Sequence, residues 1–219
     1  MISALIPSRG RPESLARSAM SLFDLAADPR NVEVLVAADP DDPDTAAAAD
    51  ELGLDCWVAP ERFGYGQIRQ YFNRLTEVAI GDWLLLWNDD ATMTTRGWDR
   101  QIEALPPRVM VADLRNAFSP GLCCFPAVRR EAIVVLGGFC PVDTPHVDSW
   151  WQEVSRRSGT IHAVDAFVHH DRFDLTGGHN DATYREGRSH LRNAEFFGIE
   201  IQAQIDVSAE VLRKRAAAL

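Results

Sequence analysis

Short apolar runs alternate with helical patterns over residues 1–90, and this alternation constrains the fold most. The runs that are typical of strands are 2–6, 32–37, 54–59 and 83–87. Segments with the apolar spacing of helices separate them, at 12–26, 45–53 and 67–79. Strands separated by helices of this length predict βαβ crossovers and a parallel sheet. The sequence therefore predicts an α/β fold with a mostly parallel central sheet flanked by helices.

The rest of the chain is less regular. The pattern predicts further strands at 109–112, 121–125 and 161–168 and helices at 129–136 and 147–158. A polar, glycine-bearing loop is expected at 169–187, followed by helical patterns from Ser189 and from 207 to the end, which form a helical tail. Because no repeat and no low-complexity linker divides the sequence, we expect a single domain over 1–219.

Charge and composition exclude several classes of protein. The sequence contains 22 Lys and Arg residues and 32 Asp and Glu residues, so its net charge is -10 over 219 residues. Nucleic-acid binding and polybasic membrane anchoring both need the opposite balance. The sequence contains no apolar run long enough for a membrane span and no signal-peptide pattern at its start. Four cysteines without a C-x-x-C pair predict reduced thiols, and together these features predict a cytoplasmic protein.

Polar residues follow the apolar runs where a parallel sheet binds its ligands, beyond the carboxyl ends of the strands. The first strand is followed by the loop 7–12, the second by Asp39, the fourth by 88–90 and the last by 169–171. These segments supply arginines, carboxylates, an amide and imidazoles to one edge. Such a set of side chains predicts an anionic ligand bridged by a divalent metal.

The strongest of these signals is the sequence Asn88-Asp89-Asp90. Two adjacent carboxylates behind a buried strand repel each other unless a cation or hydrogen-bond donors neutralise them. A helix cap or turn explains the same residues, so both interpretations stay open here. Asp39 is placed to accept a hydrogen bond from a nucleobase or ribose, although an Asp-rich stretch at 39–44 is also typical of a solvated turn.

The order of these motifs resembles the family 2 glycosyltransferases of the GT-A fold. The residues that carry the resemblance are Ile6-Pro7-Ser8-Arg9-Gly10-Arg11-Pro12, Asp39, Trp87-Asn88-Asp89-Asp90, Gly137-Gly138-Phe139 and His146-Val147-Asp148-Ser149-Trp150-Trp151. The resemblance covers about residues 2–170. The resemblance implies a Rossmann-like nucleotide-binding half at 1–90, an acceptor half at 91–170, and a loop with a helical tail at 171–219.

The resemblance also implies site residues. Those that would contact a nucleoside-diphosphate sugar, with UDP-sugars favoured, are Pro7, Ser8, Arg9, Asp39, Arg69, Asn73, Asn88 and Asp89. Asp90 would bind Mn²⁺ or Mg²⁺, with either His169 or His170 as a further ligand. Asp148 would be the general base of an inverting transfer of a hexose or N-acetylhexosamine.

Two motifs depart from the family pattern. The D-x-D triplet begins with Asn88, and the E-D pair reads Val147-Asp148, so each motif loses one carboxylate. The acceptor is a glycan, a protein or a small molecule on this interpretation. The tail 207–219 could pack on a second subunit or on its own domain.

Two rival functions are open on the sequence. A nucleotidyltransferase would need a glycine-rich loop after the first strand, which 7–12 suits poorly with its one glycine and two prolines. A nucleotide- or carbohydrate-binding module without turnover would have the same sheet but no need of Asp148. We expect Trp98, Trp150 and Trp151 to pack in the core rather than stack on an acceptor sugar.

Overall fold

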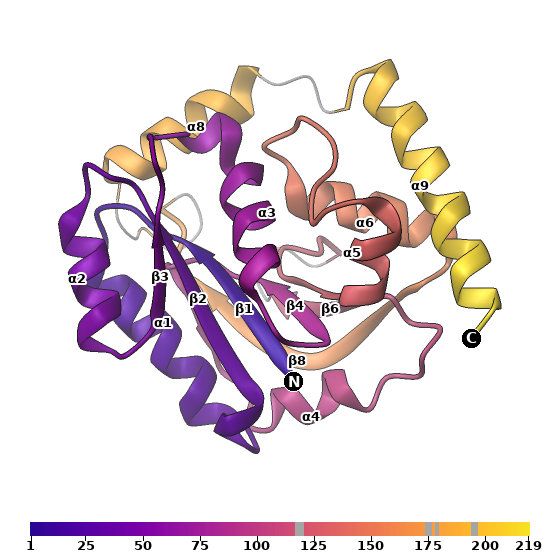
Figure 1. Ribbon diagram of the computed structural model, residues 1–219, viewed down its shortest axis with the longest axis horizontal. Helices are drawn as coiled ribbons and strands as arrows, with labels where there is room; N and C mark the ends of the chain where they lie inside the picture. The colour runs from indigo at the N-terminus through magenta and orange to yellow at the C-terminus, as the bar shows by residue number, and fades with distance from the viewer. Residues whose placement is uncertain (117–120, 174–176, 178–179, 194–196) are drawn as a thin grey trace.

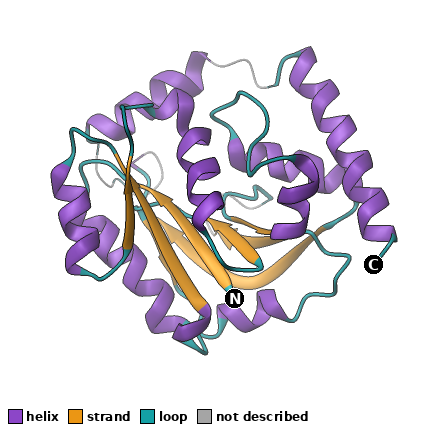
Figure 2. Ribbon diagram, viewed as in Figure 1, coloured by secondary structure: helices purple, strands orange, loops and turns teal. Residues whose placement is uncertain are grey.

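One eight-stranded sheet runs through the protein (Figures 1 and 2). The computed structural model describes residues 1–116, 121–173, 177, 180–193 and 197–219. In spatial order the strands are β3 (Asp55–Val58), β2 (Val32–Ala38), β1 (Ile2–Pro7), β4 (Trp83–Leu86), β7 (Pro126–Arg129), β6 (Val111–Asn116), β8 (Ile161–His170) and β5 (Ala91–Met93).

Four strand pairings are parallel and three are antiparallel. The half formed by β3, β2, β1 and β4 is wholly parallel, as its alternating sequence predicts. Strand β7 runs antiparallel to both β4 and β6, and β8 runs parallel to β6. The carboxyl end of β8 therefore lies at the same edge of the sheet as the carboxyl ends of β1, β2 and β4.

Helices cover both faces of the sheet. Two hydrophobic clusters, one on each face, contain the buried side chains of α1, α2 and α4 on one side and of α3, α5, α6 and α9 on the other. Helix α9 packs along α6, and α8 lies against η2, the 3-10 turn before α3 (Figure 1). Their bounds are α1 (Pro12–Leu25), η1 (Pro29–Asn31), α2 (Pro43–Glu51), η2 (Tyr65–Gln67), α3 (Ile68–Val78), α4 (Trp98–Glu103), α5 (Arg130–Leu136), α6 (Val147–Ser158), α8 (Ala182–Asn193) and α9 (Ile199–Ala217).

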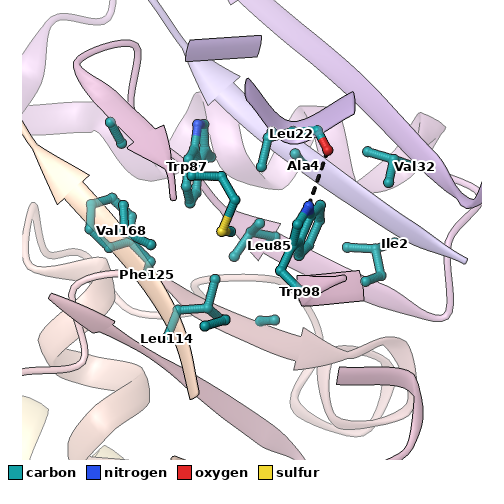
Figure 3. Packing of buried hydrophobic residues seen from close by; sticks show 14 of the residues in the cluster. Ile2, Ala4, Leu22, Val32, Leu85, Trp87, Trp98, Leu114, Phe125 and Val168 are labelled. Atoms are coloured by element: carbon teal, nitrogen blue, oxygen red, sulfur yellow. Dashed lines mark hydrogen bonds between the residues drawn. The ribbon is translucent and has the colours of Figure 1, made fainter. Parts of the chain in front are cut away.

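The first strand shows how the sequence alternation builds the two clusters. Ile2, Ala4 and Ile6 point into the α1 side, whereas Leu5 points into the α3 side. Figure 3 shows the α1 side, where large side chains from several strands meet α1 and α4. Both faces of the strand are apolar because both are covered.

The structure differs from the sequence expectation where contacts between residues far apart in the sequence determine the strands and helices. The strand expected at 121–125 lies instead at 126–129, where β4 and β6 offer backbone partners. Strand β5 is only three residues long and was not expected, because its pairing with β8 defines it. The loop expected at 169–187 gives way to α8 at Ala182, since the Asp181 carboxylate accepts from the amide of Tyr184 and caps the helix. Part of that loop lies outside the described residues, and α9 begins at Ile199, before the expected 207.

Two further expectations concern single features. The four cysteines, all within the described residues, are free thiols. Among the helices that the structure describes, none combines the length and apolar character that crossing a bilayer requires.

Trp98 joins α4 to α1 and supplies a test of the packing. Its ring is fully buried and its Nε1 donates a hydrogen bond of 3.0 Å to the Leu22 carbonyl (Figure 3). We expect Trp98→Ala to lower the free energy of unfolding by about 3–5 kcal/mol, because it removes a large core side chain. Chemical denaturation measures the change.

Val134→Ala is the matched control, since this α5 side chain is 71% exposed and should change stability by only about 0.5 kcal/mol. Equal effects of the two substitutions would contradict the core described here.

Candidate active site

A cavity of about 400 Å³ opens at the carboxyl edge of the sheet. Residues that follow β1, β2 and β4, the end of β8, and residues of α3, α6 and α8 line it. Nine of the twelve site residues predicted from the sequence line this cavity, namely Pro7, Ser8, Arg9, Asp39, Asn88, Asp89, Asp90, Asp148 and His170.

The other three do not line it, and the structure corrects their placement. Arg69 donates from Nε to Asp143 at 2.9 Å. The amide of Asn73 is occupied by the backbone of Cys140, accepting from its N–H at 2.8 Å and donating to its carbonyl at 3.0 Å. His169 is exposed, because successive residues of β8 face opposite sides of the sheet.

Asp39 anchors one end of the cavity. It is buried, and its carboxylate accepts from the Tyr71 hydroxyl and from Arg9 at 2.9 Å. Arg62 lies 3.8 Å from the same carboxylate. Burial and the bond to Asp39 raise the pKa of Tyr71, so its phenol stays a neutral donor. The stretch 39–44 is not merely a solvated turn, because Asp42 is buried and caps α2.

The loop after β4 holds two carboxylates against each other. Ser8 donates to Asp89 at 2.8 Å. Ser18 of α1 fixes the loop by donating to the Asn88 carbonyl at 2.8 Å. Burial, followed by repulsion from Asp90, raises the pKa of Asp89. The two acidic side chains are therefore held together at an electrostatic cost that a nearby cation would relieve.

Asp90 and His170 are brought together by the pairing of β5 with β8. Ala91 lies opposite His170 in the register, and the Asp171 N–H donates to the Asp90 carbonyl at 2.9 Å. This places His170 Nε2 3.1 Å from an oxygen of Asp90. The ring of His170 packs edge-on to Phe125 at 5.0 Å, which fixes its orientation.

Asp90 and His170 could supply two of the ligands that a divalent metal needs. A carboxylate just before β5 and an imidazole at the end of the neighbouring β8 are ligands that Mn²⁺ accepts. Within the described residues, no group of three His, Cys, Asp or Glu side chains is arranged to hold a metal ion. His170 Nδ1 is buried and has no hydrogen-bond partner in the part of the chain that the structure describes. The arrangement thus fits a metal that draws its remaining ligands from a bound substrate.

Arg11 lies between the acidic groups. Its Nη1 donates to Asp89 at 3.1 Å and to Asp90 at 3.3 Å. Its Nε and Nη2 donate to the two oxygens of Asp181 at 2.6 and 2.9 Å. One guanidinium therefore bridges the β4 loop and the start of α8.

Asp148 stands in the first turn of α6. It accepts from the amide of Ser149 at 2.6 Å, and its burial raises the pKa of the carboxyl. The neighbouring Trp150 and Trp151 are fully buried, as is Trp98, which confirms that these rings belong to the core. Asp148 thus offers a carboxylate to the cavity from the start of α6.

Helix α8 and the loop before α3 supply lining residues that sequence reasoning missed. Glu186 accepts from the Tyr65 amide at 3.0 Å and pairs with Arg62. A Cβ at Gly187 would lie 3.0 Å from the Tyr65 ring, so a larger residue there would push α8 away. The glycine between two polar helical residues is the one local signal of this close approach.

Comparisons with known proteins bear on the fold. No protein-family model and no curated protein matches the sequence. Solved structures do match. A mannosyltransferase from Pyrobaculum calidifontis, PcManGT, in complex with GDP-Man and Mn²⁺, is 16% identical with a TM-score of 0.64, over 99% of this chain and 73% of that one.

Two further structures match at similar levels. Residues 1–349 of TarS from S. aureus, in complex with UDP, are 12% identical with a TM-score of 0.61, over 99% of this chain and 72% of that one. Glucosyl-3-phosphoglycerate synthase from Mycobacterium tuberculosis, with Mn²⁺, UDP and phosphoglyceric acid, is 17% identical with a TM-score of 0.59, over 87% and 77%. The chain has the GT-A-type fold of these glycosyltransferases.

Asn73 tests the corrected placement. We expect Asn73→Ala to lower the free energy of unfolding by about 1–3 kcal/mol, because it leaves two backbone groups of Cys140 without a partner. Thermal or chemical unfolding measures the loss.

Arg69→Ala is the control, since its ion pair with the exposed Asp143 is worth little. A variant of Asn73 as stable as the Arg69 variant would show that the amide does not hold this loop.

Proposed function

We propose that the protein is an inverting, metal-dependent glycosyltransferase that moves a sugar from a nucleoside-diphosphate sugar to an acceptor hydroxyl. The observation that carries the proposal is the facing of Asp90 and His170, 3.1 Å apart, in the cavity that Asp148 also lines. The GT-A-type fold supports the assignment, because the similar structures are glycosyltransferases with GDP-Man and Mn²⁺, with UDP, or with Mn²⁺ and UDP.

The donor would lie across the edge formed by the first, second and fourth strands. Asp39 keeps acceptor capacity after its bonds to Tyr71 and Arg9, so it can receive an N–H of a base. Pro7, Ser8 and Arg9 would follow the nucleotide, and Asn88 and Asp89 would face the ribose or sugar. UDP remains the favoured nucleotide, and GDP is the first rival because of the mannosyltransferase.

Asp90 and His170 would hold a divalent ion, Mn²⁺ or Mg²⁺, together with oxygens of the diphosphate. When bound, such an ion stabilises the negative charge of the leaving diphosphate as a Lewis acid. The protein contributes the two side chains in fixed orientation, because the register of β5 and β8 and the Phe125 ring set them.

Asp148 would take the proton of the acceptor hydroxyl as that oxygen attacks the anomeric carbon from the opposite face. The base ends protonated, the sugar forms a bond to the acceptor oxygen, and the bond to phosphate breaks with inversion. The raised pKa of Asp148 favours its uptake of a proton.

The proposed metal site gives a prediction that compares the neighbouring residues His169 and His170. We expect Asp90→Asn and His170→Ala to abolish most of the Mn²⁺-dependent binding of a nucleoside diphosphate, because each removes a proposed ligand. His169→Ala should leave that binding at the wild-type level, since His169 is exposed on the other face of β8. Calorimetric titration with Mn²⁺, and again with a chelator, measures the effect.

Wild-type binding that is unchanged by the chelator would argue against metal dependence. Equal losses in the two histidine variants would argue against His170 as the ligand.

The base gives a second prediction. Asp148→Asn should lower the transfer rate by about 100-fold or more, because a general base typically contributes on that scale. Donor binding should persist, because the substitution preserves the size of the side chain. Asp143→Asn is the control, since Asp143 is exposed and its carboxylate pairs with Arg69 outside the cavity.

Full transfer activity in Asp148→Asn would remove the residue from the mechanism. Nucleotide binding without transfer in the wild type, over a panel of glycan, protein and small-molecule acceptors, would favour a binding module instead. The cytoplasmic location, the single domain and an oligomeric state stay predictions.

A further inference from the structure

Arg11 contacts Asp90, one of the two side chains proposed to hold the metal ion. Its Nη1 donates to both Asp89 and Asp90, and its side chain is only 12% exposed. The family resemblance assigned no role to this residue. Its contacts therefore require a separate explanation.

Acidic side chains surround Arg11. The carboxylates of Asp89, Asp90 and Asp181 all contact its guanidinium. Nη1 contacts one oxygen of Asp90, and His170 Nε2 contacts the other. A divalent cation held by Asp90 and His170 would therefore lie close to Nη1, and the two cations would repel each other.

The two sides of the guanidinium are held unequally. Toward Asp181 it makes a paired interaction of Nε and Nη2 with two carboxylate oxygens at 2.6 and 2.9 Å. Toward the β4 loop a single nitrogen is shared between two carboxylates at 3.1 and 3.3 Å. The contacts with Asp89 and Asp90 are therefore the weaker ones and the ones that open first.

We propose that Arg11 is an internal counter-cation, which holds the Asp89–Asp90 pair in the metal-free protein and which a divalent cation displaces when it binds. The inference rests on the proposed metal site. On displacement the contacts of Nη1 with Asp89 and Asp90 break, and the paired contacts with Asp181 keep the guanidinium beside the cavity. Arg11 then sets the metal affinity of the protein.

Asp181 connects Arg11 to the start of α8. Its carboxylate caps α8 by accepting from the Tyr184 amide at 2.8 Å while it binds Arg11. Thr183, in the first turn of α8, donates to the Arg9 carbonyl at 3.1 Å. These contacts join the start of α8 to the loop that carries Arg11. After displacement by the metal, Asp181 would hold the guanidinium.

The test is a titration of the full chain with Mn²⁺ alone, in which electron paramagnetic resonance measures the concentration of the free ion. Arg11→Gln removes the charge but keeps a polar side chain, and it should bind Mn²⁺ about tenfold more tightly or better, the scale on which one close charge changes a binding constant. Arg11→Lys keeps the charge but loses the paired contact with Asp181, so its Mn²⁺ affinity should stay well below that of Arg11→Gln. Arg69→Gln is the control for losing an arginine outside the cavity.

Asp181→Asn provides the opposite test. Asparagine caps a helix as well as aspartate does, so α8 should persist. The guanidinium then loses its paired carboxylate and binds Asp89 and Asp90 more strongly, so Mn²⁺ affinity should fall severalfold. This variant keeps the proposal testable even if Arg11→Gln does not fold.

Tighter Mn²⁺ binding in Arg11→Gln together with weaker binding in Asp181→Asn would support the proposal. Equal Mn²⁺ affinity in the wild type and Arg11→Gln, or tighter binding in Asp181→Asn, would overturn it and leave the proposed transferase intact. If neither the wild type nor Arg11→Gln binds Mn²⁺, with or without UDP, the proposed metal site fails together with the role of Arg11.

Discussion

The cavity is organised around the repulsion between Asp89 and Asp90. The two carboxylates sit at the end of a strand that is buried on both faces, where water cannot screen them fully. Each neighbouring element supplies something that offsets this cost. Ser8 from the first loop donates to Asp89, Arg11 bridges both, and His170 from the last strand contacts Asp90.

Asn88, the residue at which the triplet departs from the D-x-D pattern, fits this arrangement. Its amide nitrogen lies 3.2 Å from His170 Nε2, beside the contact of that nitrogen with Asp90. An aspartate at this position would place a third carboxylate beside Asp89 and Asp90. The amide keeps a polar contact with the imidazole without that addition.

The sequence predicts the part of the fold that is governed by local pattern. The parallel half of the sheet follows from apolar runs whose alternate residues enter two separate cores, as Leu5 and Ile6 do. The burial of His170 and the exposure of His169 could have been predicted as well, since Val164, Ala166, Val168 and His170 are the buried members of an alternating strand. The positions of β5 and β7 could not, because they depend on partners far along the chain.

Two of the positions that the resemblance implied, Arg69 and Asn73, do not line the cavity. Asn73 and Arg69 lie on α3 near the cavity in sequence terms, yet the backbone of Cys140 and the side chain of Asp143 hold them. Conversely, Asp181 and Glu186 lie within the stretch expected to be a loop, and the packing of α8 on η2 brings them to the site. Charged residues that act across long sequence separations leave no local signal.

Diffraction at the manganese absorption edge, from crystals grown with Mn²⁺ and the nucleoside diphosphate that binds most tightly, tests the proposed site most directly. We expect an anomalous peak between Asp90 and His170, in contact with the diphosphate, with the base near Asp39. A diphosphate bound without a metal peak at that position, or a nucleotide seated outside this cavity, would contradict it.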